Sequence, residues 1–161
     1  MINLKKIFLN FYFVLLAAST FISCGRSTTP EAAEALQSII PKPVKVTPTG
    51  KMFLLTDDSN VFVEGESPEL ANIARYLTSK LNPSTGFDLS VTPTTGAPAA
   101  GNIYLTLGGD TELGNEGYLL SVTEDMIKVT ANQAAGLFRG VQTIRQLFPA
   151  KIESGVKQEL S

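Results

Sequence analysis

The residue best suited to chemistry in this 161-residue sequence is its single cysteine, Cys24. Lys5 and Lys6 precede an almost wholly apolar run over residues 7–22, and the small residue Ser23 stands directly before the thiol. A basic start, an apolar run and a small residue at the cleavage point are typical of a secretory signal peptide. An uncleaved membrane helix is the weaker alternative, because spanning a bilayer takes about 20 apolar residues.

The segment Phe21-Ile22-Ser23-Cys24 resembles the lipobox of bacterial lipoproteins, with Phe21 where that motif usually has Leu, Val or Ile. The resemblance implies that residues 1–23 are removed and that a diacylated Cys24 becomes the mature N-terminus, which anchors the protein to a membrane. Gly25, standing where Asp would favour the inner membrane, implies the outer membrane. The absence of an acidic run after it favours the periplasmic face. Residues 24–38 then form a polar tether.

Other reactive groups are scarce. Histidine is absent, which excludes Ser-His-Asp and Cys-His catalysis and histidine-bound metals. The pairs Asp57-Asp58 and Glu124-Asp125 would suit calcium or acid–base chemistry, but their surroundings favour turns. Gly108-Gly109-Asp110 superficially resembles a phosphate loop, yet no Gly-Lys-Ser/Thr and no helix start follows. We therefore expect no catalytic residue, no metal site and no cofactor.

The charge balance also limits the partners. The formal net charge is −2, and no basic cluster is interleaved with aromatic residues. Phosphate backbones repel such a surface, so nucleic acid is not expected as a partner.

The alternation of apolar and polar residues predicts six strands, the last two joined as an antiparallel hairpin. They are expected over residues 51–55, 60–63, 89–92, 103–107, 118–122 and 126–130, with 93–101 as a loop. In strand 103–107 the pattern predicts one face more buried than the other.

Helical spacing predicts two amphipathic helices and one short N-terminal helix over 29–37. The first long helix begins at Ser67-Pro68-Glu69, carries an apolar stripe over 70–81 and ends at Asn82-Pro83. The second starts after the cap Asn132 and stops at Pro149.

The order β-β-α-β-β-β-β-α predicts an α+β fold, with a mainly antiparallel or mixed sheet and two amphipathic helices packed on one face. We place this domain at 39–149 and the start of a linker at 150–161. Gly136 and Gly140 share one helical face, which indicates close packing rather than ligand binding. Arg139 and Arg145 could reach a partner surface, although solvated helix charges are the commoner case.

Four stretches occur in an order that resembles the N-terminal domain of β-N-acetylhexosaminidases of glycoside hydrolase family 20. They are Ile39-Ile40-Pro41-Lys42-Pro43; the helix over 70–81 followed by Ser84-Thr85-Gly86-Phe87; Glu116-Gly117-Tyr118-x-Leu120; and Ala134-x-Gly136-Leu137-Phe138-x-Gly140-Val141-Gln142-Thr143-x-x-Gln146-Leu147. The resemblance implies a non-catalytic, zincin-like α+β domain that supports a (β/α)8 barrel following it in the polypeptide.

In that family the barrel carries an adjacent Asp-Glu pair, and its Glu is the general acid. Its Asp orients the substrate's own acetamido group, which attacks the anomeric carbon, unlike the usual two-carboxylate scheme. No position here matches these residues, so the chain alone is expected to be inactive and its glycan substrate to bind through the barrel. The alternatives are a free-standing carbohydrate-binding or scaffold lipoprotein, or a different glycosidase such as an α-glucuronidase.

Overall fold

The computed structural model describes residues 30–157, so Cys24 and the expected signal peptide lie outside the described residues. The elements are α2 (Pro30–Ser38), β1 (Val61–Glu64), α3 (Pro68–Thr85), β2 (Val91–Thr94), β3 (Asn102–Leu107), η1 (Thr111–Leu113), β4 (Tyr118–Val122), β5 (Met126–Ala131), α4 (Ala134–Leu147) and η2 (Ala150–Ser154). Within residues 30–157, the helices are too short or too polar to cross a membrane.

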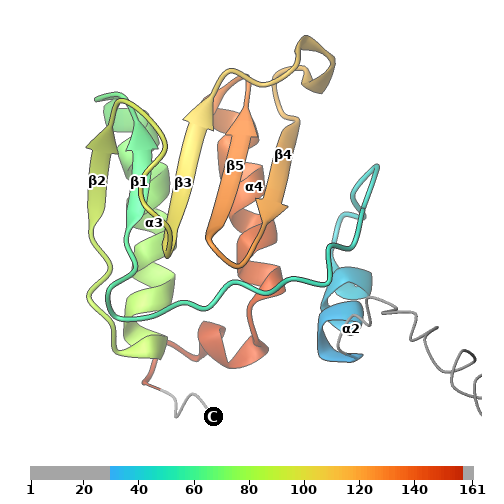
Figure 1. Ribbon diagram of the computed structural model, residues 1–161, viewed down its shortest axis with the longest axis vertical. Helices are drawn as coiled ribbons and strands as arrows, with labels where there is room; N and C mark the ends of the chain where they lie inside the picture. The colour runs from blue at the N-terminus through green and yellow to red at the C-terminus, as the bar shows by residue number, and fades with distance from the viewer. Residues whose placement is uncertain (1–29, 158–161) are drawn as a thin grey trace, which may run out of the picture.

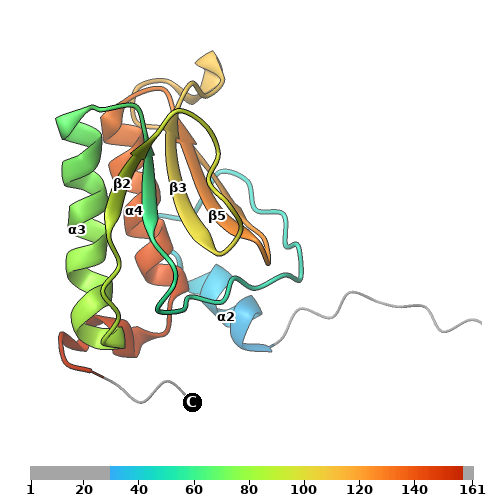
Figure 2. The ribbon, with the colours of Figure 1, turned by 60° about the vertical axis from the view of Figure 1, so that its left-hand side comes forward.

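The strands form one sheet in the order β2-β1-β3-β5-β4, with α3 and α4 side by side on one face (Figures 1 and 2). This confirms the α+β class and the placing of both amphipathic helices on the same face. The sheet is mixed, as expected, but it is not mainly antiparallel, because only β4 and β5 pair antiparallel and the other three pairings are parallel. Helix α3 is a crossover between β1 and β2, which makes that pair parallel.

The core lies between the sheet and the two helices. Alternate residues of β1, β3 and β5 point into it and meet the apolar stripes of α3 and α4, as in Val63, Leu105, Leu77 and Val141. In the central strand β3 the other face is covered as well, because Tyr104 is only 3 % exposed. The expected contrast between the two faces of this strand is therefore wrong.

Helix α3 begins as predicted, since the Ser67 hydroxyl accepts a hydrogen bond from the Leu70 amide. It ends later than predicted, because Pro83 lies inside the last turn. A proline there removes only one intrahelical hydrogen bond, so the helix continues to Thr85. Gly86 then ends it at φ 74°, donating its amide hydrogen to the Asn82 carbonyl.

The strand expected over 51–55 does not form. Phe53 and Leu55 pack against the core, while Met52 and Leu54 are exposed, so the alternation reflects burial without sheet pairing. This segment runs across the foot of the sheet toward β1 (Figure 1).

Strand β2 extends through Pro93, which was expected to lie in a loop. An edge strand tolerates proline, because the missing amide hydrogen can fall on the unpaired side.

The packed domain continues past Pro149, where the linker was expected to begin. Helix η2 places Ile152 in the core at 5 % exposure, and the buried Ser84 hydroxyl donates to the Ile152 carbonyl.

At the N-terminal end of α4, Asn132 does not cap the helix as predicted. Gln133 occupies the cap position. The side-chain amide of Asn132 instead donates to the backbone carbonyls of Asp110 and Gly114.

Candidate functional site

The acidic pairs that could suit catalysis or metal binding lie in connecting segments between the helices and strands. Asp57-Asp58 occupies a turn, where the Asn60 amide donates to the Asp58 carbonyl. Glu124 forms an ion pair of 3.5 Å with Lys51. Among residues 30–157, no three potential metal-binding side chains gather at one place.

The Gly108-Gly109-Asp110 segment has a structural role too, because it leads into η1. Asp110 accepts a hydrogen bond from the Glu112 amide at 3.1 Å and so caps η1. A short 3-10 helix therefore follows the glycines, where no helix start was expected.

The motif residues instead meet around α4, which lies directly on β4 and β5. A Cβ atom at Gly136 would lie 2.3 Å from the Gly117 carbonyl oxygen. One at Gly140 would lie 2.4 Å from a methyl carbon of Val129 and 3.2 Å from the Tyr118 ring. These distances are far below van der Waals contact, which confirms that the two glycines serve close packing.

Side-chain contacts extend this packing along the helix. The hydroxyl of the half-buried Tyr118 and the hydroxyl of the buried Thr143 are 2.5 Å apart. At the surface, Arg139 donates to Glu116 in an ion pair of 2.6 Å. The Arg139 side chain is 56 % exposed, so it is a solvated helix charge, as the commoner case predicted. We call Glu116, Gly117, Tyr118, Gly136, Arg139, Gly140 and Thr143 the α4 junction.

Gln146 connects α4 to the N-terminal part of the domain. The Ile40 amide donates to Gln146 Oε1 at 2.8 Å, and Gln146 Nε2 donates to the Ile40 carbonyl at 3.0 Å. One side-chain amide thus satisfies both backbone groups of a residue 106 positions away. The Ile39-Ile40-Pro41 motif is joined to the α4 motif by this pair.

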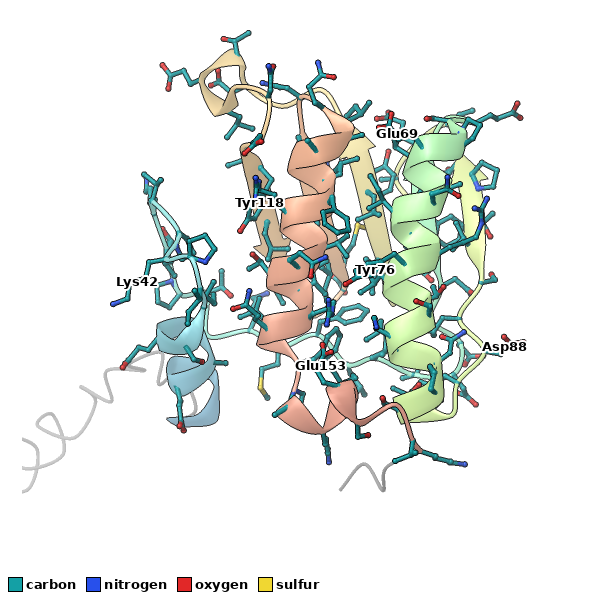
Figure 3. The ribbon with its side chains drawn as sticks, turned by 180° about the vertical axis from the view of Figure 1, so that it is seen from behind. Lys42, Glu69, Tyr76, Asp88, Tyr118 and Glu153 are labelled. Carbon is teal, nitrogen blue, oxygen red and sulfur yellow. The ribbon has the colours of Figure 1, made fainter. Side chains whose placement is uncertain are left out.

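Arg145 is held inside the domain. Its guanidinium donates two hydrogen bonds to Glu153, one to Gln142 at 2.7 Å and one to the Tyr76 hydroxyl. The hydrogen bond to Glu153 raises the pKa of Arg145 and lowers the pKa of the Glu153 carboxyl, although burial opposes both shifts. With its side chain only 18 % exposed, Arg145 is not the solvated charge that was expected. Figure 3 shows Tyr76 between α3 and α4, with Glu153 below it.

A shallow groove of about 530 Å³ opens between α2, α4 and η2. Arg145 and Glu153 line it, and they neutralise each other. Gln142 Nε2, a neighbouring donor, is buried and has no hydrogen-bond partner within residues 30–157. The groove therefore offers hydrogen-bonding groups and the carboxylate of Glu34, and among the described residues no three potential metal-binding side chains gather there.

A domain whose characteristic residues hold its own helices and strands together belongs to the class of structural domains. The chain belongs to the family described as glycosyl hydrolase family 20, domain 2, whose model matches residues 36–159.

Two curated relatives are similar over most of this chain. The β-hexosaminidase of Porphyromonas gingivalis is 36 % identical over 118 residues, covering 73 % of this chain and 15 % of the relative. The β-N-acetylhexosaminidase of Cellulomonas fimi is 35 % identical over 111 residues, covering 68 % of this chain and 22 % of the relative. The chain thus spans less than a quarter of either relative.

Solved structures show the same relation. The family 20 β-N-acetylhexosaminidase of Streptomyces coelicolor matches with a TM-score of 0.69 and 38 % identity, covering 76 % of this chain and 24 % of that one. The β-hexosaminidase of Streptomyces plicatus, in complex with N-acetylglucosamine, matches with a TM-score of 0.68 and 36 % identity over 77 % of this chain and 24 % of its own. In homologues, a domain of this family accompanies a catalytic barrel domain.

Proposed function

We propose that this domain belongs to a polypeptide that hydrolyses terminal N-acetyl-D-hexosamine residues from glycans, and that it supports the catalytic (β/α)8 barrel of that polypeptide. The observation that carries the proposal is the family match over residues 36–159, together with relatives 35–38 % identical that are β-N-acetylhexosaminidases.

The chemistry in this proposal comes from the barrel. An Asp-Glu pair there would direct retaining, substrate-assisted cleavage, with Glu as the general acid and the substrate's acetamido group as the nucleophile. Residues 30–157 contribute a rigid body instead. The packed α4 junction and the Gln146–Ile40 pair fix α4, the sheet and the N-terminal segment relative to one another. Such a body can hold an adjoining domain at a constant position.

A release assay with a chromogenic N-acetyl-β-D-glucosaminide tests the assignment. We expect turnover from a polypeptide in which this domain is followed by the barrel, and none from the 161-residue chain alone. Turnover by the isolated chain would contradict the non-catalytic role. Glycan-array binding by the isolated chain, without turnover of the longer polypeptide, would favour a carbohydrate-binding scaffold.

We also propose that the protein is exported and anchored through acylated Cys24 to the periplasmic face of the outer membrane. The support is the lysine-led apolar run that ends in Ser23-Cys24. Mass spectrometry of the mature N-terminus should find a diacylglyceryl group on Cys24. The substitution Cys24→Ala should abolish it, whereas Ser27→Ala, three residues further on, should leave it in place. An unmodified Cys24 in the wild-type protein would refute the anchor.

A further inference from the structure

The large apolar side chains that are exposed on this domain are concentrated in one segment. Within residues 30–157, five of the nine lie between positions 40 and 54: Ile40, Val44, Val46, Met52 and Leu54. Val44 is fully exposed, and Ile40 and Leu54 are each more than three-quarters exposed. Single exposed apolar residues are ordinary, but a cluster of them indicates a surface that binds something.

The same segment is basic. It carries Lys42, Lys45 and Lys51 and no acidic residue between positions 40 and 54, in a chain whose formal charge is −2. Lys51 is paired with Glu124, whereas Lys42 extends away from the domain beside α2 in Figure 3. We call residues 42–54 the basic loop. Exposed apolar side chains beside lysines are the combination that binds the interface of an anionic bilayer.

The position of the loop relative to the expected anchor supports a bilayer as its binding partner. Only five residues separate Cys24 from Pro30, the first residue of α2. Fully extended, they reach roughly 20 Å, so α2 must stay within that distance of an acylated Cys24. The Gln146–Ile40 pair joins the segment directly after α2 to the rest of the domain. All three views show the first part of the basic loop next to α2, and α3 lies on the far side of the molecule (Figures 1 to 3).

We propose that the basic loop lies on the bilayer and forms a second membrane contact next to the lipid anchor. Val44 and Val46 enter the interface between headgroups and acyl chains, and Lys42 and Lys45 bind anionic headgroups. The inference rests on the proposed acylation of Cys24. Its consequence is orientation, because two contacts hold the domain with α2 and the loop toward the membrane and with α3 away from it.

The chain contains no tryptophan, so a single introduced tryptophan reports its own surroundings. The acylated full-length protein carrying Val44→Trp is reconstituted into vesicles of phosphatidylcholine and phosphatidylglycerol, some with brominated acyl chains. We expect its emission to shift to shorter wavelength and to be quenched by the bromine atoms. The matched control is Phe138→Trp, at a 41 % exposed aromatic residue that contacts Tyr76 of α3, where neither change is expected.

Charge reversal tests the lysines. Lys42→Glu combined with Lys45→Glu, in the Val44→Trp background, should lower the ratio of membrane-bound to free loop by roughly 30-fold or more, seen as loss of bromine quenching. Lys80→Glu combined with Lys157→Glu makes the same change in charge beside α3, since Lys80 belongs to α3 and Lys157 lies against Gly86, and should leave the quenching unchanged.

Three outcomes are separable. Vesicle-bound, acylated protein in which the Val44→Trp emission stays unshifted and unquenched would overturn the loop contact and leave the anchor intact. An unmodified Cys24 would overturn the anchor and, with it, the loop proposal. Protection of the same reporter from iodide in a longer, barrel-containing polypeptide without vesicles would assign the loop to the interdomain interface and so also contradict the proposal.

Discussion

At the scale of single residues, this domain uses its unusual side chains to bring elements together. Glycine in the middle of α4 lowers helix stability by roughly 1 kcal/mol relative to alanine. At Gly140 this cost is offset by an approach of helix to sheet that a methyl group would block. Arg145 likewise gives up hydration to join α4, η2 and Tyr76 of α3.

The substitution Gly136→Ala should destabilise the domain by about 1–3 kcal/mol, because the new methyl group would collide with the backbone oxygen of Gly117. Urea unfolding followed by circular dichroism measures the change. Gly96→Ala is the matched control, since a Cβ atom there meets nothing within 4 Å. Equal stability of the two variants would show that α4 can move off the strands without cost.

The Arg145–Glu153 pair should make stability depend on pH. The pKa of Glu153 is lowered in the folded state, chiefly by the hydrogen bond from Arg145. Its stabilising contribution is therefore complete above the unfolded pKa of about 4.3 and is lost as the pH falls through the lower folded value. Because Glu153 is 43 % exposed, the contribution is roughly 1 kcal/mol or less.

Unfolding free energies measured between neutral pH and pH 3 check this expectation. Glu153→Gln should flatten the acid limb of the stability curve relative to the wild type. Glu112→Gln, at an exposed residue of η1, should leave the slope unchanged. A wild-type slope retained in Glu153→Gln would assign the pH dependence to other carboxylates.

At the scale of elements, α4 contacts most of the domain. It packs on β4 and β5 through its glycines, reaches Ile40 through Gln146 and holds η2 through Arg145. The four sequence stretches that identify the family include the α4 motif and the segments at positions 39–40 and 116–118 that it contacts. Their resemblance to the family therefore reflects the demands of packing.

The Gln146–Ile40 pair predicts a local effect on the N-terminal segment. Gln146→Leu keeps the size of the side chain but removes both hydrogen bonds, so the free energy of unfolding should fall by about 1 kcal/mol. Hydrogen exchange at the Ile40 amide should accelerate more than exchange in the core. Gln37→Leu, an exposed amide on α2, is the control and should preserve the slow exchange. Unchanged protection in Gln146→Leu would mean that other contacts hold the segment.

Local chemistry made several elements predictable from the sequence. Ser67-Pro68 specifies the start of α3, and a three-residue connection specifies the β4–β5 hairpin. The partners of β1 could not be predicted, because apolar periodicity records which face is buried but not which strand lies alongside. The same limit explains the missing strand over 51–55.

The candidate site shows the same division. The close packing of Gly136 and Gly140 follows from the residue type and the helical spacing. The partners of Gln146 and Arg145 do not follow, since a helix pattern gives no distance to a residue 106 or 69 positions away. Only the recurrence of Gln146 within a family motif signalled that its side chain matters.

At the scale of the whole molecule, the folded domain extends to η2, and the chain spans less than a quarter of the curated relatives it matches. Ile152 is buried in the core, and the chain covers 24 % of each of the two Streptomyces structures compared above. The segment after α4 is therefore part of the folded body. Substitutions or truncations in η2 should therefore lower the stability of the domain.

Ending the chain after Pro149 should lower the melting temperature by about 10 °C or more, because it removes the buried Ile152 and the partner of Arg145. Ending it after Lys157 keeps both groups and should change little. Differential scanning calorimetry of the two shortened chains makes the comparison. Equal melting temperatures would show that η2 adds nothing to the folded body.

The Gln146–Ile40 pair also determines when the N-terminal segment can be fixed in place during synthesis. A chain made from its N-terminus cannot secure its first folded segment until nearly all of the domain has been translated, and strand β1 likewise waits for β2 and β3. Pairings this distant in sequence form slowly. For the exported polypeptide proposed above, such delay would be useful, because the translocation channel would receive a chain that has not yet folded.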